Sequence, residues 1–408
     1  MTRVVLAGGS VFDGSGADPV RADVAIAGGT IVEVGQGLTG DDVVDVTGRM
    51  VAPGLIDCHV HTIFDGMDLS RIQAEPFSLQ FFQTISAFDR LLRSGVTTVR
   101  DAGGADLGVK TAVSRGMVAG PRMSIAISVL SQTGGHVDGW NVHGDLCRLM
   151  VPHPGRPECV VDGVDAMRKR VRELLRAGAD TIKVCSSGGV MSPRDDPRHP
   201  QFSYAELRAC VDEASRAGRP VMAHAHGAEG IKQALRAGVR SIEHGVFLDE
   251  EGVELLLEHD AWLVPTLMAP ASLVAAIDAG MAVTPDIEAK ARSIARTHLE
   301  AVARAHRAGV KIAMGTDSGV FPHGSSPQEL VWLVRAGLSP QQALHAATAS
   351  AADLLEMPAV GRLEPGKAAD LIVLEGDVWD FERFGDNLAM VFQNGARWST
   401  APGDSGVV

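Results

Sequence analysis

Two histidines separated by one valine, His59 and His61, follow the apolar run in "PGLIDCHVHT" at Pro53–Thr62. On a β-strand, side chains two residues apart point to the same side, so both imidazoles would face one site. An isolated pair of this kind is usually structural. A metal site becomes the better interpretation where further ligands stand at the ends of other strands.

Such residues follow along the chain. They are Lys183 in "DTIKVCSS", His224 and His226 in "AHAHG", His244 in "IEHG" and Asp317 in "MGTDSG". Each alone has an ordinary explanation: a hydrogen-bonded histidine, a lysine extending to solvent, or an aspartate capping a helix. All of these explanations would have to hold together at five strand ends, so the set favours a metal site.

The donor types agree with this interpretation. Imidazoles and a carboxylate suit divalent zinc first, and also manganese, cobalt or iron. An ammonium beside a dication is repelled, so Lys183 must lose its charge. Addition of CO₂ would make it a carbamate, whose two oxygens can bridge two metals. We expect Cys58 and Cys185, which stand close in sequence to proposed ligands, to face away from the site.

A recurring phrase indicates how these residues are positioned. An arginine is followed by a glycine and then by an apolar β-branched run, as in "RAGADTIKV" at Arg176 and "RAGVRSIEH" at Arg236. Glycine supplies the left-handed residue that ends a helix, and arginine suits the negative helix end. The phrase therefore marks a junction from helix to strand.

Eight strands are predicted in this way. They are Leu55–His59, Val96–Arg100, Met123–Val129, Thr181–Val184, Val221–His224, Ser241–Glu243, Trp262–Thr266 and Lys311–Met314. Helical stretches such as Val164–Leu175, Tyr204–Arg216 and Ile287–Arg307 lie between them. This alternation predicts an α/β fold, a parallel (β/α)8 TIM barrel over residues 53–360. An open doubly wound sheet would carry a glycine-rich phosphate loop after its first strand, where this chain has "HVHTIFDG".

The two ends of the chain differ from the rest. Residues 1–52 and 361–398 contain short β-like runs broken by glycines. We expect residues 1–52 and 361–408 to form one small β-sandwich domain beside the barrel.

Composition limits the partners. The 408 residues carry a net charge of −13 and no basic block, which argues against nucleic acid. No apolar window is long enough to cross a membrane, and the start reaches glycines too early for a signal peptide. The five scattered cysteines form no CxxC pair. We expect a cytoplasmic homo-oligomer that acts on a small molecule, with no membrane partner.

The ligand pattern resembles the amidohydrolase superfamily, in its binuclear branch with a carboxylated lysine. The phrases "APGLIDCHVH", "SIEHG", "GTDSG" and "GRLEPGKAADLIVL" resemble the imidazolonepropionase-like and Xaa-Pro dipeptidase (prolidase-like) group, and the resemblance covers nearly the whole chain. It implies two divalent metal ions with a hydroxide between them. The implied ligands are His59, His61 and Asp317 for one metal, His224 and His244 for the other, and carboxylated Lys183 as the bridge.

The resemblance also implies roles in catalysis and binding. Asp317 would transfer the proton, and His136 in "QTGGHVDG" would polarise the scissile carbonyl; a solvent-exposed loop residue is the alternative for His136. His226 stands at a position that is often tyrosine in the related dipeptidases and lies toward the substrate carboxylate. His323 in "FPHGSSPQEL" is a candidate for the pocket wall or an approach loop. The backbone amides of Gly188 and Gly189 are candidates for carboxylate binding.

The predicted function is hydrolysis of an amide bond in dipeptides (Xaa-Pro or other) or N-acyl amino acids. Aryl ureas, carbamates, cyclic amides of the imidazolonepropionase type and an amide-linked toxin such as ochratoxin are the alternatives. A mononuclear deaminase would not need Lys183. A non-catalytic scaffold would have lost ligands, and this chain retains the full set.

Overall fold

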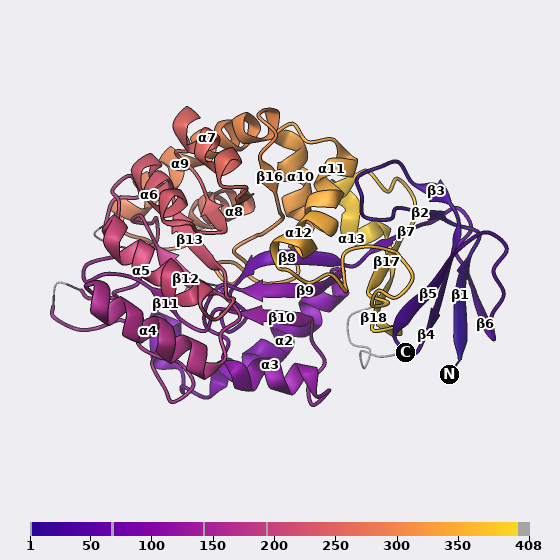
Figure 1. The fold of residues 1–408 in the computed structure, drawn as a ribbon, viewed down its shortest axis with the longest axis horizontal. Helices are drawn as coiled ribbons and strands as arrows, with labels where there is room; N and C mark the ends of the chain where they lie inside the picture. The colour runs from indigo at the N-terminus through magenta and orange to yellow at the C-terminus, as the bar shows by residue number, and fades with distance from the viewer. Residues whose placement is uncertain (1, 67–68, 142, 193–194, 399–408) are drawn as a thin grey trace.

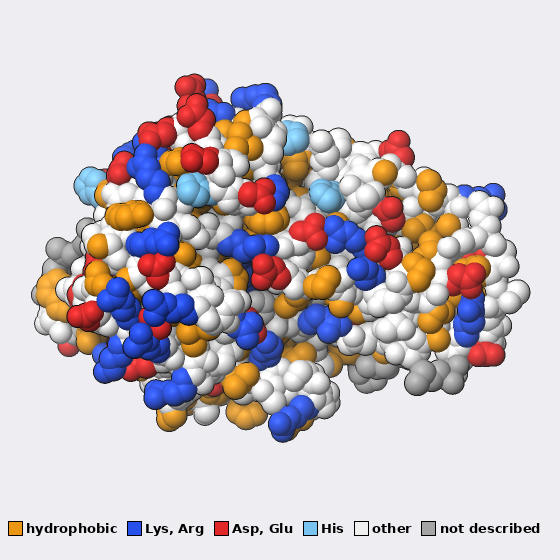
Figure 2. All heavy atoms as spheres, in the orientation of Figure 1, with side chains coloured by type: hydrophobic (Ala, Val, Ile, Leu, Met, Phe, Trp, Pro, Cys, Tyr) orange, Lys and Arg blue, Asp and Glu red, His pale blue; other side chains and the backbone are white. Residues whose placement is uncertain are grey.

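The computed structural model describes residues 2–66, 69–141, 143–192 and 195–398. Helices surround a group of strands in the larger part of the molecule, and a smaller part built of strands lies at one end (Figure 1). Within the described residues, no helix has the length and apolar character needed to cross a membrane. Figure 2 shows acidic, basic and apolar side chains interspersed over one face.

The smaller part joins both ends of the chain. One sheet has the order β5 (Thr30–Gly35), β4 (Asp23–Ala27), β1 (Arg3–Ala7), β6 (Asp42–Asp45). The other has the order β19 (Ala396–Trp398), β18 (Leu388–Gln393), β17 (Leu371–Leu374), β7 (Met50–Pro53), β2 (Ser10–Val11), β3 (Val20–Arg21). β7 pairs with β17 in antiparallel register, and Leu6, Val24 and Phe392 share one apolar core. β7 extends to Pro53, and residues 399–408 of the predicted β domain lie outside the described residues.

The larger part contains two parallel sheets. The first has the order β10 (Arg122–Ile125), β9 (Val96–Asp101), β8 (Leu55–Val60). The second has the order β11 (Val129–Leu130), β12 (Ile182–Cys185), β13 (Val221–Ala225), β14 (Ser241–His244), β15 (Trp262–Val264), β16 (Lys311–Ile312). The N–H of Cys58 donates to the carbonyl of Met314 (2.8 Å), and the N–H of Gly104 donates to that of Ile127 (2.8 Å). The first bond joins β8 to the residues that follow β16. The N–H of Asp180, just before β12, donates to the carbonyl of Ile125 in β10 (2.8 Å), so backbone bonds run between the two sheets on both sides.

The predicted third strand is wrong in one respect, because it is not continuous. Ile127 has a left-handed φ of 70°, and the N–H of Ser128 donates to the carbonyl of Ala126 (2.9 Å). A β-branched residue in this conformation is held there only by its surroundings. The strand is therefore divided into β10, which pairs with β9, and β11, which pairs with β12.

Helices follow most of the parallel strands. They are α1 (Leu69–Ala74), α2 (Leu79–Arg93), α3 (Leu107–Ser114), α4 (Val164–Ala177), α5 (Tyr204–Ser215), α6 (Ala228–Ala237), α7 (Glu250–Glu258), α8 (Met268–Asp278), α9 (Pro285–Arg307), α10 (Gln328–Arg335), α11 (Pro340–Ala346) and α12 (Ala349–Leu354), with η1 (Phe381–Arg383) and α13 (Phe384–Asn387) near the C-terminus. Gly178 and Gly238 end α4 and α6 in the left-handed conformation, at φ 95° and 98°. The predicted helix-to-strand junctions are confirmed at these two positions.

The packing of the strands determines which side chains face the site. In β12, Ile182 and Val184 belong to the apolar core that also contains Leu174 of α4 and Leu207 of α5. Lys183 lies between them in sequence and lines a cavity. The alternation of a strand therefore directs apolar side chains toward the helices and the lysine toward the space between the strands.

Candidate active site

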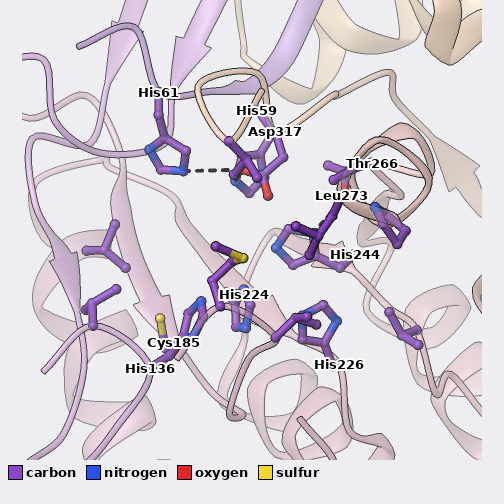
Figure 3. A pocket seen from close by; sticks show the side chains of 18 of the residues that line it. His59, His61, His136, Cys185, His224, His226, His244, Thr266, Leu273 and Asp317 are labelled. Carbon is purple, nitrogen blue, oxygen red and sulfur yellow. Dashed lines mark hydrogen bonds and ion pairs between the residues drawn. The ribbon is translucent and has the colours of Figure 1, made fainter. Parts of the chain in front are cut away.

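A cavity of about 110 Å³ lies where the parallel strands end (Figure 3). His136 and His226 line it. So do all six predicted metal ligands, which are His59, His61, Lys183, His224, His244 and Asp317. A neighbouring cavity of about 440 Å³ shares His136, Leu149 and Met191 with the first. A substrate larger than the first cavity therefore has adjoining space on the His136 side.

His59 and His61 converge on Asp317. The Nε2 atom of each ring is 3.4 Å from Oδ1 of Asp317. Nδ1 of His61 is 2.7 Å from the carbonyl oxygen of Gly103, and Nδ1 of His59 is 2.8 Å from Oε2 of Glu243. These partners accept hydrogen bonds, so both rings carry a proton on Nδ1, and the Nε2 atom of each ring faces Asp317. Such outer partners fix the tautomer that a metal ligand needs.

Glu243 is a residue that the sequence interpretation missed. Its side chain is inaccessible to solvent, and it accepts a hydrogen bond from Nη2 of Arg100 (2.9 Å) as well as from His59. Burial opposes ionisation, but Arg100 and His59 lower the pKa of Glu243 to about 2. Burial lowers the pKa of His59 to about 4, so its ring is neutral and available as a ligand. The sequence does contain a signal for this pair, because Arg100 and Glu243 are charged residues inside the apolar runs "TTVRD" and "SIEH".

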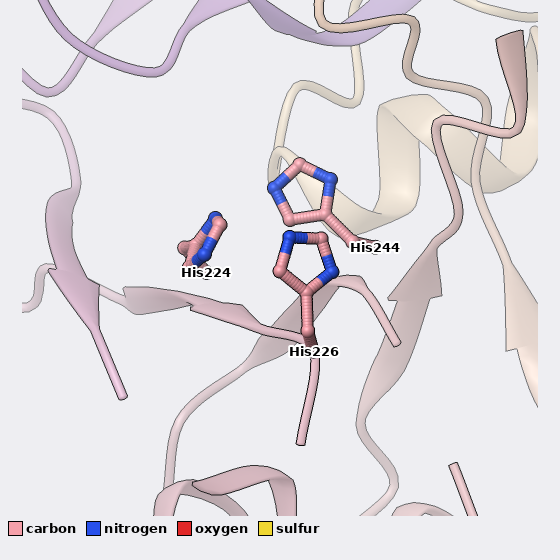
Figure 4. A group of neighbouring side chains, drawn as sticks. All are labelled: His224, His226 and His244. Carbon is pink, nitrogen blue, oxygen red and sulfur yellow. The ribbon is translucent and has the colours of Figure 1, made fainter. Parts of the chain in front are cut away.

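His224, His226 and His244 form a second group (Figure 4). One donor atom from each ring lies within 4.8 Å of the others, and His244 also belongs to a group with His59 and Asp317. Nε2 of His224 donates to the carbonyl of Gly188 (3.2 Å), which leaves Nδ1 as the lone pair. The structure thus brings His226, the predicted substrate contact, into one group with His224 and His244, the predicted ligands of the second metal.

Three non-glycine residues of the site have left-handed backbones. His244, Thr266 and Asp317 have φ values of 72°, 51° and 64°. Nδ1 of His244 lies 2.7 Å from the hydroxyl of Thr266, so two of the three support each other directly. Such conformations cost free energy and persist where the surrounding structure enforces them, often at functional sites.

Lys183 lies within this group of ligands. Its Nζ atom is 3.3 Å from Nε2 of His59, and the residue is 2% exposed. Burial lowers the pKa of Lys183, and among the described residues no carboxylate forms an ion pair with it. A buried ammonium without an ion-pair partner is unfavourable. The neutral amine is also the form that adds CO₂, so the residue fits the bridging role.

His136 is held against the second group rather than in solvent. Its ring stacks on that of His224 at 4.3 Å between centroids, and its Nδ1 lies 2.8 Å from Oγ of Ser192 and 3.8 Å from Oδ2 of Asp195. A Cβ on Gly189 would lie 2.0 Å from Cε1 of His136. Glycine at position 189 is therefore what allows the ring to lie over His224.

Two predicted backbone donors are not free to bind a substrate. The amide of Gly188 donates to the carbonyl of His199 (3.1 Å), and the amide of Gly189 donates to Asp195 (2.9 Å). Neither glycine is among the described residues that line the cavity. The bonds that close the loop use both amides, and the two glycines instead position His224 and His136.

His323 and Cys185 also lie elsewhere than expected. His323 is buried with Nε2 2.9 Å from the carbonyl of Phe64, and it is not among the described lining residues. Cys185 lines the cavity (Figure 3), because it is two residues beyond Lys183 and shares its side of β12. Cys58 does face away, toward Trp262 and Val264.

Comparison with known proteins identifies the class. Residues 50–400 match the Amidohydrolase family, so the chain belongs to that family. The predicted superfamily and the predicted class of reaction, hydrolysis of a carbon–nitrogen bond, are thereby confirmed.

Particular relatives agree with this assignment. The chain is 38% identical to an ochratoxinase of Aspergillus niger over 343 residues, which cover 80% of this chain and 70% of that protein. The crystal structure of a Xaa-Pro dipeptidase with bound methionine superposes with a TM-score of 0.89 at 32% identity, covering 97% of this chain and all of that chain. A prolidase complexed with N-methylphosphonate-L-proline gives a TM-score of 0.88 at 36% identity, with coverages of 97% and 99%.

Proposed function

We propose that this chain hydrolyses an amide bond of a small molecule with two divalent metal ions. His59, His61 and Asp317 would hold one ion, His224 and His244 the other, and carboxylated Lys183 would bridge them. The observation that carries this proposal is the convergence of the Nε2 atoms of His59 and His61 on Asp317, with the Lys183 amine 3.3 Å from His59. When bound, such ions polarise a carbonyl and lower the pKa of a water molecule. The nitrogen and carboxylate donors suit zinc first, and manganese, cobalt or iron as well.

Asp317 is the proposed base. Burial opposes its ionisation, but His59 and His61 lower the pKa of Asp317 overall, so the side chain is anionic at neutral pH. Asp317 accepts the proton of the attacking water and delivers it to the leaving amine.

His136 is the proposed partner of the scissile carbonyl. A ring nitrogen that carries a proton can donate to the oxygen as negative charge develops on it. The hydroxyl of Ser192 donates a hydrogen bond to the carboxylate of Asp195. Its oxygen therefore accepts the hydrogen bond from Nδ1–H of His136. Nε2 of His136 then donates only when the ring is charged, and Asp195 stabilises that form.

Dipeptides and N-acyl amino acids are the first proposed substrates. The support is the similarity to a Xaa-Pro dipeptidase, a prolidase and an ochratoxinase. Uncharged amides, carbamates, ureas and cyclic amides are the second candidate class. The observation in favour of that class is that the amides of Gly188 and Gly189 are already used within the loop.

Metal content together with a substrate panel tests the proposal. Two metals per chain, and release of an amine from dipeptides, N-acyl amino acids or ureas, are expected. One metal per chain and release of ammonia from a heterocycle would point to a mononuclear deaminase. A chain that binds no metal and hydrolyses none of the panel would be a scaffold.

We further propose that the parallel strands close into an eight-stranded (β/α)8 barrel over residues 53–360. The bonds from Cys58 to Met314 and from Asp180 to Ile125 support this closure. Residues 1–52 with 361–408 would be a separate β-sandwich, supported by the pairing of β7 with β17. The cytoplasmic location and the homo-oligomer stay predictions, and the five cysteines, all free in the structure, are compatible with a reducing compartment.

A further inference from the structure

Glu329 is a buried carboxylate that no role assigned above uses. It stands in the first turn of α10 and is 0% exposed. Burial raises the pKa of Glu329 well above its usual value, and the carboxylate of Asp57 acts in the same direction. Burying such a group is costly unless hydrogen-bond donors compensate it. The groups that bind Glu329 therefore indicate why the chain keeps a carboxylate there.

The partners of Glu329 are two consecutive backbone amides at the start of α8. Oε1 accepts a hydrogen bond from the N–H of Leu267 (2.8 Å), and Oε2 accepts one from the N–H of Met268 (2.7 Å). The first N–H groups of a helix have no acceptor within it, and the helix dipole favours a carboxylate at this end. Both amides oppose the effect of burial on the pKa of Glu329. Glu329 thus fixes the start of α8 to α10.

The residue before these amides contacts a proposed metal ligand. Thr266 is 0% exposed and has a left-handed φ of 51°, which a β-branched residue adopts only where its neighbours hold it. Its hydroxyl lies 2.7 Å from Nδ1 of His244, and Figure 3 shows the two side chains side by side. Because Thr266 engages Nδ1 of His244, Nε2 is the atom left to bind a metal.

Resting on the proposed binuclear site, we infer that Glu329 is a positioning residue for the metal ion at His224 and His244. It acts through Thr266: the carboxylate holds the two amides that follow Thr266, and the Thr266 hydroxyl orients the ring of His244. The ring of His59, at the other ion, is oriented by Glu243 instead. Each of the two ions thus has a ligand that a separate buried carboxylate holds in place.

Glu329→Gln tests this inference on the full-length protein loaded with zinc. Gln keeps the size of the side chain but has one oxygen, so one of the two amides loses its acceptor. We expect the affinity for the zinc ion at His224 and His244 to fall by about two- to tenfold, the effect of one hydrogen bond. The affinity for the other zinc ion should stay unchanged. Stepwise removal by a chelator, followed as zinc per chain, measures both, and His244→Ala shows which step belongs to which ion.

Glu206→Gln is the matched control. Glu206 also accepts hydrogen bonds from two backbone amides at the start of a helix, those of Gly163 (2.7 Å) and Ser203 (2.8 Å). It is not among the described residues that line the cavity. The Tm of Glu206→Gln should fall as that of Glu329→Gln does, whereas both zinc affinities of Glu206→Gln should stay unchanged.

Variants of Thr266 show whether the effect passes through its hydroxyl. Thr266→Ala removes the contact with Nδ1 of His244 and should lower the affinity for the same ion by about 10- to 100-fold, the usual loss for such an outer partner. Thr266→Ser keeps the hydroxyl and should retain most of the affinity. In the Thr266→Ala background, Glu329→Gln should have no further effect on that ion.

Hydrogen exchange of the wild-type protein gives a test that needs no folded variant. Coupling between two sites is reciprocal, so a metal ion that depends on these amides also stabilises their hydrogen bonds. Addition of the second zinc ion should therefore slow exchange at the amides of Leu267 and Met268. The amides of Gly163 and Ser203, bound by Glu206, are the reference and should exchange at the same rate with one zinc ion or two.

Several outcomes would overturn the inference. If Glu329→Gln and Glu206→Gln lower the Tm alike and neither changes a zinc affinity, Glu329 only holds α8 to α10. Equal weakening of both zinc ions in Glu329→Gln, an additive effect in the Thr266→Ala background, or unchanged exchange at Leu267 and Met268 would also contradict it. A wild-type protein that binds fewer than two zinc ions would instead contradict the proposed binuclear site itself.

Discussion

Nδ1 of His59 lies 2.8 Å from Oε2 of Glu243, and the two side chains are 1% and 0% exposed. Glu243 is in turn bound by Arg100 at 2.9 Å. The chain therefore buries a charged pair beneath a proposed metal ligand, and the anion of that pair fixes the proton of His59 on the side away from Asp317. A buried pair of this kind adds little net stability. Its evident use is to orient the histidine.

Replacing Glu243 by Gln should weaken metal binding. Gln keeps the size of the side chain but loses the charge that holds Nδ1–H of His59 and balances Arg100. We expect metal affinity to fall by about 10- to 100-fold, the usual loss for such an outer partner, as measured by competition with a chelator. Glu254→Gln, at an exposed position, is the control and should change nothing. Unchanged affinity in Glu243→Gln would contradict the orienting role.

Lys183→Ala should lose both metal and activity. The amine lies 3.3 Å from His59, and the carbamate proposed there is the bridge between the two ions. Short carboxylic acids supplied with metal should restore part of the activity, because a carboxylate offers the same two oxygens. Metal analysis and turnover are the measurements, and Lys169→Ala, whose side chain is 79% exposed, is the control. Full activity of Lys183→Ala would exclude the binuclear interpretation.

Asp317→Asn separates the two roles of this residue. Asn keeps an oxygen toward His59 and His61 but cannot take the proton of the attacking water. Turnover should fall by roughly 10²–10⁴-fold, as expected for a lost general base, while much of the metal stays bound. Single-turnover kinetics on protein of measured metal content gives the answer. Near-normal turnover in the metal-loaded variant would refute the transfer of a proton by Asp317.

His323 should affect stability at low pH rather than catalysis. Burial lowers its pKa to about 4, although the carbonyl of Phe64 opposes this. The unfolded chain binds this proton below about pH 6.5, whereas the folded protein binds it only below about pH 4. The contribution of His323 to the free energy of unfolding therefore falls as the pH decreases from about 6.5 to 4.

His323→Gln removes this titration. The difference in free energy of unfolding between the wild type and the variant cancels the contributions of the other titrating groups. The wild type should lose about 3 kcal/mol relative to the variant over this range, at about 1.4 kcal/mol per pKa unit. Denaturant unfolding at several pH values provides the measurement. KM should stay unchanged, because the ring does not line the cavity. A large rise in KM would instead return His323 to the substrate site.

The sequence was sufficient where a local rule determines the geometry. The two-residue period of a strand places His59 with His61, and glycine at a helix end determines where a strand begins, as at Gly178. The same rule, applied correctly, would also have placed Cys185 beside Lys183. These inferences require only neighbours in sequence.

The remainder depends on contacts between distant segments. Glu243 is recognisable as a positioning residue only once β8 and β14 place it against His59. The sequence does not show that the amides of Gly188 and Gly189 are used within the loop, because their acceptors, the carbonyl of His199 and the side chain of Asp195, come from later residues of that loop. Glu329 occupies an ordinary position in the first turn of α10, and only the packing of that helix brings it to the amides of Leu267 and Met268.

Asp195 provides a last prediction, which concerns His136. Oδ2 of Asp195 lies 3.8 Å from Nδ1 of His136 and accepts hydrogen bonds from the amide of Gly189 (2.9 Å) and from Gln201 (3.1 Å). Burial lowers the pKa of His136, and the charge of Asp195 raises it. Because Nε2 of His136 donates only from the charged ring, loss of the Asp195 charge should lower kcat.

Asp195→Asn keeps the shape of this loop while removing the charge. We expect kcat to fall by about tenfold, the effect of about 1.4 kcal/mol on the barrier, with metal content unchanged. The basic limb of the pH–kcat profile should move to lower pH, since the charged form of His136 loses its stabilising partner. Asp196→Asn, whose carboxylate pairs with Arg198 at 3.7 Å and not with His136, is the matched control. If both variants lose activity equally and the profile does not move, Asp195 only shapes the loop, and His136 must donate from the neutral ring, with its proton on Nε2.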